Sequence, residues 1–144
     1  MKTIHSFTID HDMHDKGFYF SSEANNIFTY DLRFKTPNGG DYLSNPAMHT
    51  IEHLFATVVR NSSVENQVVY FGPMGCRTGF YLLLLGIQKQ DAFELTKQVV
   101  ADCLKQTVIP GCERKNCGNY LEHNLADAKK ELSAYLEVLN NLKF

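Results

Sequence analysis

The segment NIFTYDLRFK, residues 26–35, constrains the fold of this chain most strongly, because its apolar and polar side chains alternate. The apolar members are Phe28, Tyr30, Leu32 and Phe34, and the polar members are Thr29, Asp31, Arg33 and Lys35. Successive side chains of a β-strand point to opposite faces, so the alternation indicates a strand with one face in a core. Arg33 is expected to point away from that core.

Two further strands are indicated by QVVYFG and GFYLLLLG, which flank the glycine-rich turn PMGCRTG. A short strand is also placed near Phe7 or Phe18. Apolar residues with helical spacing begin near residue 45, where Asn45 is expected to cap a helix and Pro46 to lie in its first turn.

Helical spacing returns after Gly86, in the segment QDAFELTKQVVADCLKQTV and again from about Asn124 to Leu142. The first of these segments begins with Asp91 and Glu94 in capping-box spacing. Strands and helices in this order, with connections too short for a repeated βαβ pattern, predict an α+β fold. We expect a mostly antiparallel sheet with helices packed on one face, in a single domain over residues 1–144.

The composition indicates a compact chain and does not indicate nucleic acid or an anionic membrane as its partner. Its 144 residues are 44% hydrophobic and 12% aromatic, which predicts one domain with a sizeable core. The formal net charge is -2 and no basic run occurs, so neither nucleic acid nor an anionic membrane is expected as a partner. The longest apolar run, FYLLLLG, is much shorter than the roughly 20 residues of a membrane-spanning helix.

The chain has four cysteines and begins without the apolar core of a signal peptide. This combination indicates a reducing compartment, in which thiols stay free for metal binding or catalysis. We therefore expect a cytoplasmic protein.

The motif HTIEH, residues 49–53, places two imidazoles four residues apart on a helix with a carboxylate between them. His49 and His53 lie roughly 40° apart around the helix axis, so one metal ion could bind both. Glu52 would border the ion without ligating it, as a proton-transfer group does. The same pattern also occurs on solvated helix faces, so the pair needs further ligands.

A third ligand is expected from the loop IPGCERKNCGNYLEH. Cys117 is the first choice, because the following glycine keeps local bulk low. Cys112 could serve instead, form a redox pair with Cys117, or be an unligated loop thiol. Cys103 is expected to be a buried apolar side chain in a helix.

Cys76 lies in the turn GPMGCRTG, with Arg77 next to it. Backbone N–H groups of the turn and this neighbouring cation would favour its thiolate form, which makes Cys76 a candidate acid–base group or nucleophile. A second metal-bound thiolate and an ordinary turn cysteine are the alternatives. Ser6, His11 and His14 lie in a polar N-terminal segment, and His123 is expected to be a surface residue or to lie at the start of the third helix.

With these residues in view, the chain resembles the S-ribosylhomocysteine lyase (LuxS) family. Three blocks carry the resemblance, HTIEHLFATVVRN, GPMGCRTGFYLLLLG and NCGNYLEHNLADAKKEL, and SFTIDHD and YDLRFKTPN agree upstream. Together they cover nearly the whole chain. One departure is VVYFG before PMGC, where family members often have an acidic residue and a serine. It leaves the contribution of Tyr70, Phe71 and Gly72 to substrate binding open.

The resemblance implies one divalent metal ion per subunit, iron(II) in native enzymes and often zinc or cobalt after isolation. Its ligands would be His49, His53 and Cys117, with water or substrate in the fourth position. The resemblance also implies Cys76 and Glu52 as the proton-transfer groups. Substrate contacts would come from Ser6, His11 and Arg33, and Cys112 is not among the implied ligands.

The implied reaction cleaves S-ribosylhomocysteine into homocysteine and 4,5-dihydroxy-2,3-pentanedione, the precursor of a quorum-sensing signal, by carbonyl migration and β-elimination. Members of the family are homodimers with active sites at the subunit interface, so N-terminal residues of one chain would complete the site of the other. Two other functions fit the motif. H-x-x-E-H also occurs in metallopeptidases, and a fourth protein ligand from Cys112 or Cys76 would make the metal site structural.

Overall fold

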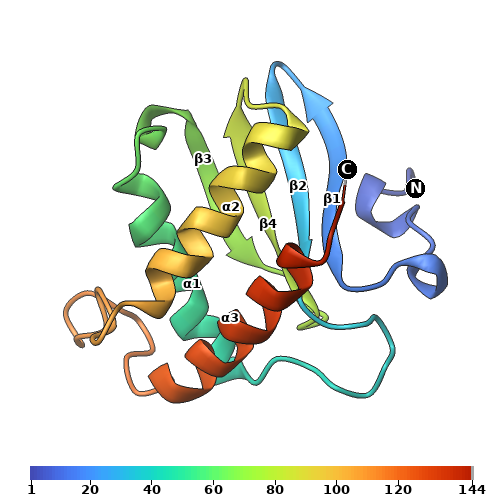
Figure 1. Ribbon diagram of the computed structural model, residues 1–144. Helices are drawn as coiled ribbons and strands as arrows, with labels where there is room; N and C mark the ends of the chain where they lie inside the picture. The colour runs from blue at the N-terminus through green and yellow to red at the C-terminus, as the bar shows by residue number, and fades with distance from the viewer. Residues whose placement is uncertain (144) are drawn as a thin grey trace.

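The computed structural model describes residues 1–143, in which four strands form one antiparallel sheet. The strands are β1 (Gly17–Ala24), β2 (Ile27–Arg33), β3 (Val68–Pro73) and β4 (Gly79–Leu85), in the spatial order β1-β2-β4-β3. The helices α1 (Asn45–Arg60), α2 (Lys89–Leu104) and α3 (Leu125–Asn140) all lie on one side of this sheet (Figure 1). The expected α+β class and the packing of the helices on one face are confirmed.

Short 3₁₀ turns complete the chain at η1 (His5–Phe7), η2 (His11–Met13) and η3 (Glu65–Gln67). The strand expected near Phe18 is therefore β1, whereas the region of Phe7 forms a 3₁₀ turn. No helix in residues 1–143 is both long and apolar enough to cross a bilayer.

The alternation in β2 produces the two faces expected for it. Tyr30 and Leu32 are buried in the core beneath the helices, next to Phe34 just after the strand. Asp31 and Arg33 belong to the opposite face, which we call the outer face of the sheet. Both are nevertheless buried, because they pair with each other and His14 of the N-terminal segment contacts Asp31.

Two helix starts differ from expectation. Ser44, and not Asn45, is the N-cap of α1, since its hydroxyl accepts the N–H of Ala47. Helix α2 begins at Lys89 without a side-chain cap, so the expected capping box at Asp91 is wrong. Asp91 lies in the first turn, where its charge is favourable for the helix dipole.

Helix α3 packs as its apolar spacing predicts, and Asn124 caps it by accepting the N–H of Asp127. The ring of Tyr135 stacks on Phe34 at 3.9 Å, and its hydroxyl donates to the carbonyl of Gly17 in β1. These contacts fix α3 against the sheet. The start of α3 is therefore held in a defined position relative to α1.

Candidate metal centre and active-site cavities

Four side chains that can ligate a metal ion converge where the loop before α3 meets α1. They are His49, His53, Cys117 and His123, whose ligand atoms all lie within 4.8 Å of one another. The sulfur of Cys117 is 3.4 Å from Nε2 of His49 and 3.9 Å from Nε2 of His53. A tetrahedral ion with metal–nitrogen bonds of about 2.0–2.1 Å and metal–sulfur bonds of about 2.3 Å separates such atoms by about 3.5 Å. The donor set therefore fits a divalent cation of the zinc or iron type.

Backbone carbonyls determine which nitrogen of two of these rings faces the cluster. Nδ1 of His49 lies 2.9 Å from the carbonyl oxygen of Glu122, and Nδ1 of His53 lies 2.8 Å from that of Pro110. A carbonyl oxygen can only accept, so each Nδ1 carries the hydrogen and each Nε2 keeps its lone pair. Gly111, with a φ of +64°, forms the turn that brings the Pro110 carbonyl to His53. Both imidazoles are thus oriented as metal ligands.

His123, expected at the surface or at the start of the third helix, lies just before α3 and belongs to this cluster. Its Nε2 is 3.8 Å from the Cys117 sulfur, and its Nδ1 is 2.9 Å from the hydroxyl of Thr50. Burial, followed by the neighbouring His49 and His53, lowers the pKa of His123 to about 4. The ring is therefore neutral at physiological pH.

Ring geometry separates His123 from the other two imidazoles. It stacks on His49 with centroids 3.9 Å apart and planes 24° apart, whereas His49 and His53 are nearly perpendicular at 84°. Two ring planes inclined by 24° with centroids 3.9 Å apart meet about 9 Å from those centroids. A metal ion bound to an imidazole nitrogen lies only about 3 Å from the ring centroid. In this arrangement the two stacked rings do not both point an in-plane lone pair at one ion, so a site with all four ligands would require one of them to rotate.

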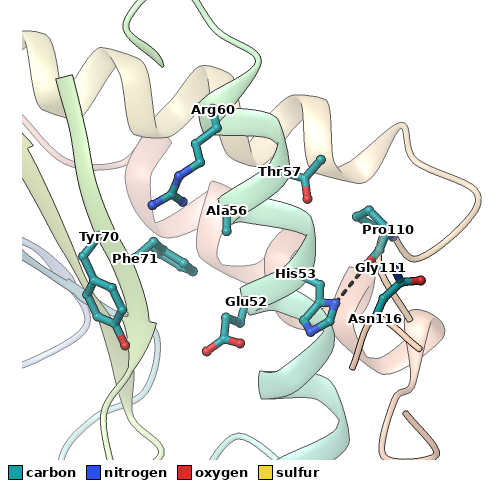
Figure 2. Close-up of a pocket in the computed structure, with 10 residues that line it drawn as sticks. All are labelled: Glu52, His53, Ala56, Thr57, Arg60, Tyr70, Phe71, Pro110, Gly111 and Asn116. Carbon is teal, nitrogen blue, oxygen red and sulfur yellow. Dashed lines mark hydrogen bonds between the residues drawn. The ribbon is translucent and has the colours of Figure 1, made fainter. Parts of the chain in front are cut away.

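Glu52 lines a cavity of about 420 Å³ beside the cluster, between α1 and β3 (Figure 2). Glu52 and Arg60 extend from α1 toward β3, and His53 turns to the loop of Pro110 (Figure 2); Tyr70 of β3 also lines the cavity. A carboxylate, a guanidinium and a phenol thus border one hollow next to a candidate metal site. We call this hollow the Glu52 cavity.

A second cavity, of about 440 Å³, contains Cys76. Ser6, His11 and Arg33 also line it, so the structure brings these four candidate residues together. Nδ1 of His11 donates to the carbonyl of Ile9, which leaves Nε2 as an acceptor. We call this hollow the Cys76 cavity. It shares no lining residue with the Glu52 cavity, so the two expected proton-transfer groups lie in different hollows of one chain.

The cation that was expected to act on Cys76 points elsewhere. Arg77 has a φ of 61° and donates to the carbonyl of Leu43, and its guanidinium lies over the ring of Tyr42. The sulfur of Cys76 instead lies 3.1 Å from the hydroxyl of Thr78. The expectation for Arg77 is therefore wrong, because the left-handed backbone at this residue directs its side chain toward the loop before α1.

The residues before the PMGC turn that depart from the usual family pattern, Tyr70, Phe71 and Gly72, lie on β3. Phe71 is buried in the core and stacks on Phe55 and Phe80. Tyr70 is 51% exposed and lies across Gly72, since a Cβ on that glycine would meet the Tyr70 hydroxyl. Gly72 thus allows the Tyr70 ring to rest on the outer face of the sheet.

The two remaining cysteines differ from Cys117. Cys103 is buried in α2, as expected, and burial raises the pKa of its thiol to about 12. Cys112 is a partly buried loop thiol that does not belong to the ligand cluster. Neither the position of Cys112 nor that of Cys76 supports a four-ligand site closed by one of these thiols.

Known proteins are similar to this chain in sequence over nearly its whole length. A family model described as S-Ribosylhomocysteinase (LuxS) matches residues 4–143. The S-ribosylhomocysteine lyase of Borreliella afzelii is 48% identical over 99% of this chain and 96% of the relative. The enzymes of that name from Finegoldia magna and Porphyromonas gingivalis are 44% and 38% identical, over 99% and 97% of this chain and 95% and 93% of their own lengths. The chain belongs to the S-ribosylhomocysteinase (LuxS) family.

Proposed function

We propose that this chain is a metal-dependent lyase that converts S-ribosylhomocysteine to homocysteine and 4,5-dihydroxy-2,3-pentanedione, a precursor of a quorum-sensing autoinducer. The observation that carries the proposal is the convergence of two imidazole Nε2 atoms and one thiol, in a chain matched by this family model over residues 4–143. The names of the relatives support the substrate.

His49, His53 and Cys117 would hold one divalent ion, with iron(II) as the native metal and zinc or cobalt as substitutes. When bound, the ion supplies Lewis-acid chemistry that favours negative charge on the sugar oxygens. The stacking of His123 on His49 supports leaving the fourth position open. A closed structural site, with His123 as fourth ligand, is the competing interpretation, because Nε2 of His123 lies within reach of the same ion.

The proton transfers are assigned to two side chains. The sugar carbonyl moves from C1 to C2 and then to C3, and each shift removes a proton beside the carbonyl and returns one to the neighbouring carbon. The sulfur of Cys76 and the carboxylate of Glu52 would hold and return these protons. Glu52 would then remove the C4 proton, so that the electron pair forms a C4–C5 double bond and homocysteine leaves C5 as its thiolate. Protonation of the resulting enol at C5 gives the dione.

Substrate orientation is assigned to Ser6, His11 and Arg33, which line the Cys76 cavity. Their hydroxyl, imidazole and guanidinium suit a polyhydroxylated chain. The four cysteines are unpaired in the structure, which supports a reducing compartment such as the cytoplasm.

A homodimer is proposed because one chain divides its candidate catalytic groups between two cavities. The outer face of the sheet also presents Tyr70, Tyr81 and Leu83, which line a shallow hollow of about 330 Å³ together with Ser6. Apolar side chains of this kind on an open sheet face favour association with a second copy. Docking of two such faces would unite Glu52 of one subunit with Cys76 of the other.

The lyase reaction is tested by incubating anaerobically purified protein with S-ribosylhomocysteine and titrating the released thiol. We expect one equivalent of homocysteine per substrate, lost after chelation and restored by iron(II) or cobalt(II). Absence of thiol release from the metal-loaded protein would refute the function. Cleavage of peptides without thiol release would favour a metallopeptidase.

The shared site is tested with a heterodimer of Glu52→Gln and Cys76→Ala chains, purified through two different tags. Each homodimer is expected to be inactive. The heterodimer should recover about half of wild-type activity, since one of its two sites pairs an intact Glu52 with an intact Cys76. An inactive heterodimer with normal metal content would place both groups of a site in the same chain.

A further inference from the structure

Thr78 joins the thiol of Cys76 to a buried ion pair. Thr78 is 1% exposed, and its hydroxyl oxygen lies 3.1 Å from the Cys76 sulfur. The same oxygen lies 2.8 Å from Nη1 of Arg33. Thr78 was not singled out by any sequence pattern, because its role depends on contacts across the sheet.

The direction of the hydrogen bond between Thr78 and Cys76 follows from the donors and acceptors around the Thr78 hydroxyl. A guanidinium can only donate, so the Thr78 oxygen must accept the hydrogen of Arg33 Nη1. The hydroxyl has one hydrogen of its own, and a buried hydroxyl needs an acceptor for it. The sulfur of Cys76 is the partner that the structure provides. The hydroxyl therefore donates to the sulfur.

Rigid contacts hold Thr78 in this role. Its backbone carbonyl accepts the N–H groups of both Phe34 and Lys35, at 2.8 and 2.9 Å. Arg33 is fixed in turn by two bonds to Asp31, from Nε at 3.1 Å and from Nη2 at 2.5 Å. The thiol thus faces a hydroxyl whose oxygen and backbone cannot shift without disturbing the sheet.

The groups around the thiol include one fixed cation and one histidine. Arg33, His11 and Tyr81 line the Cys76 cavity, and His14 contacts the far side of Asp31 at 3.1 Å. Arg77 is directed to Leu43 and Tyr42 instead. The guanidinium of Arg33, which is also paired with Asp31, donates to the Thr78 oxygen and so polarises the hydroxyl that faces the sulfur.

We propose that Thr78 is the positioning residue of Cys76, whose hydroxyl orients the sulfur into the cavity and stabilises its thiolate form. The inference rests on the proposed function only where it assigns proton transfer to Cys76. A thiolate held in one direction could accept a proton from a bound sugar carbon without first breaking a bond to water.

The test measures how fast iodoacetamide alkylates Cys76 between pH 5 and 10, with the modified peptide identified by mass spectrometry. Thr78→Val keeps the shape of the side chain and removes the donor. We expect the midpoint of the alkylation-against-pH curve to rise by about one to two pH units, because hydrogen bonds to charged groups have this strength. Thr78→Ser keeps the hydroxyl and should retain the wild-type midpoint.

Controls separate this effect from a loss of structure. Cys112 is an internal reference, since its alkylation should be the same in wild type and Thr78→Val. Thr78→Val also leaves Nη1 of Arg33 without its acceptor, so a second variant is needed. Arg33→Lys keeps the positive charge and removes the hydrogen bond from Nη1 to the Thr78 hydroxyl. It should raise the midpoint as well.

An unchanged midpoint in both Thr78→Val and Arg33→Lys would overturn the inference. The alkylation assay reports on the thiol whether or not the protein cleaves S-ribosylhomocysteine. A wild-type protein without lyase activity would therefore refute the proposed function and leave this inference intact.

Discussion

Replacing Asp31 by asparagine removes the negative member of a buried ion pair. Asp31 and Arg33 are both about 1% exposed, and asparagine cannot accept from both Nε and Nη2 of Arg33 as the carboxylate does. Breaking one partner of a buried pair costs about 3–5 kcal/mol, because the other charge stays desolvated. For 144 residues, an unfolding entropy of about 2.1 cal/mol/K per residue converts this cost to a fall in Tm of about 10–16 °C.

The assay is thermal unfolding followed by circular dichroism at pH 7, with equal protein concentration and metal loading. Asp41→Asn is the matched control, since Asp41 pairs with Lys35 but is 78% exposed, and its Tm should fall by at most about 3 °C. The double change Asp31→Leu with Arg33→Met removes both charges and should recover most of the stability. A Tm for Asp31→Asn within about 3 °C of wild type would refute the claim that this pair is structurally essential.

Three further predictions concern the metal cluster and the titrating core. His53→Ala should abolish stoichiometric cobalt(II) binding. His123→Ala should weaken cobalt(II) binding by about 10–100-fold and keep the thiolate-to-cobalt absorption band. Equal losses of binding in the two variants would support a closed four-ligand site. Tyr30 has a pKa raised to about 12 by burial and then by Asp91. Its contribution to stability is therefore complete below about pH 10 and is lost as the pH rises toward 12, so the urea midpoints of wild type and Tyr30→Phe should converge over that range. The pKa of Cys103, raised to about 12, predicts that iodoacetamide at pH 8.5 modifies this thiol only in urea, which peptide mapping can check.

The faces of strands and helices followed from the sequence because burial repeats with the period of each element. Tyr30 and Leu32 were assigned to the core on alternation alone, and Leu132 and Leu139 on helical spacing. Helix starts are harder to predict from a sequence, because neighbouring residues can compete for one cap. Ser44 precedes Asn45, both residue types cap helices well, and only the observed bond to Ala47 distinguishes them.

The contacts at the site were harder to predict, because they depend on how distant segments dock. His123 enters the metal cluster because Thr50 of α1 contacts its ring and accepts the N–H of Asn124, and this contact has no periodic signal in the sequence. Adjacency in the sequence predicts Arg77 as the cation near Cys76, but its side chain is directed to Leu43 and Tyr42. Antiparallel pairing of β2 with β4 places Arg33 opposite Gly79, and so beside Thr78. The spacing Cys117-x₅-His123, directly before a capped helix, is the one local feature that could have suggested a fourth member of the cluster.

The separation of Glu52 from Cys76 follows from the sheet itself. Cys76 lies in the turn between β3 and β4, and Arg33 and Tyr81 of the outer face line its cavity. Glu52 extends from α1, on the helix side of the sheet, to the edge formed by β3. Slipping β3 by one residue against β4 would turn the buried Phe71 out of the core. A second copy docked on the outer face avoids this cost, so we expect turnover per chain to fall when the protein is diluted below the dissociation constant of the dimer.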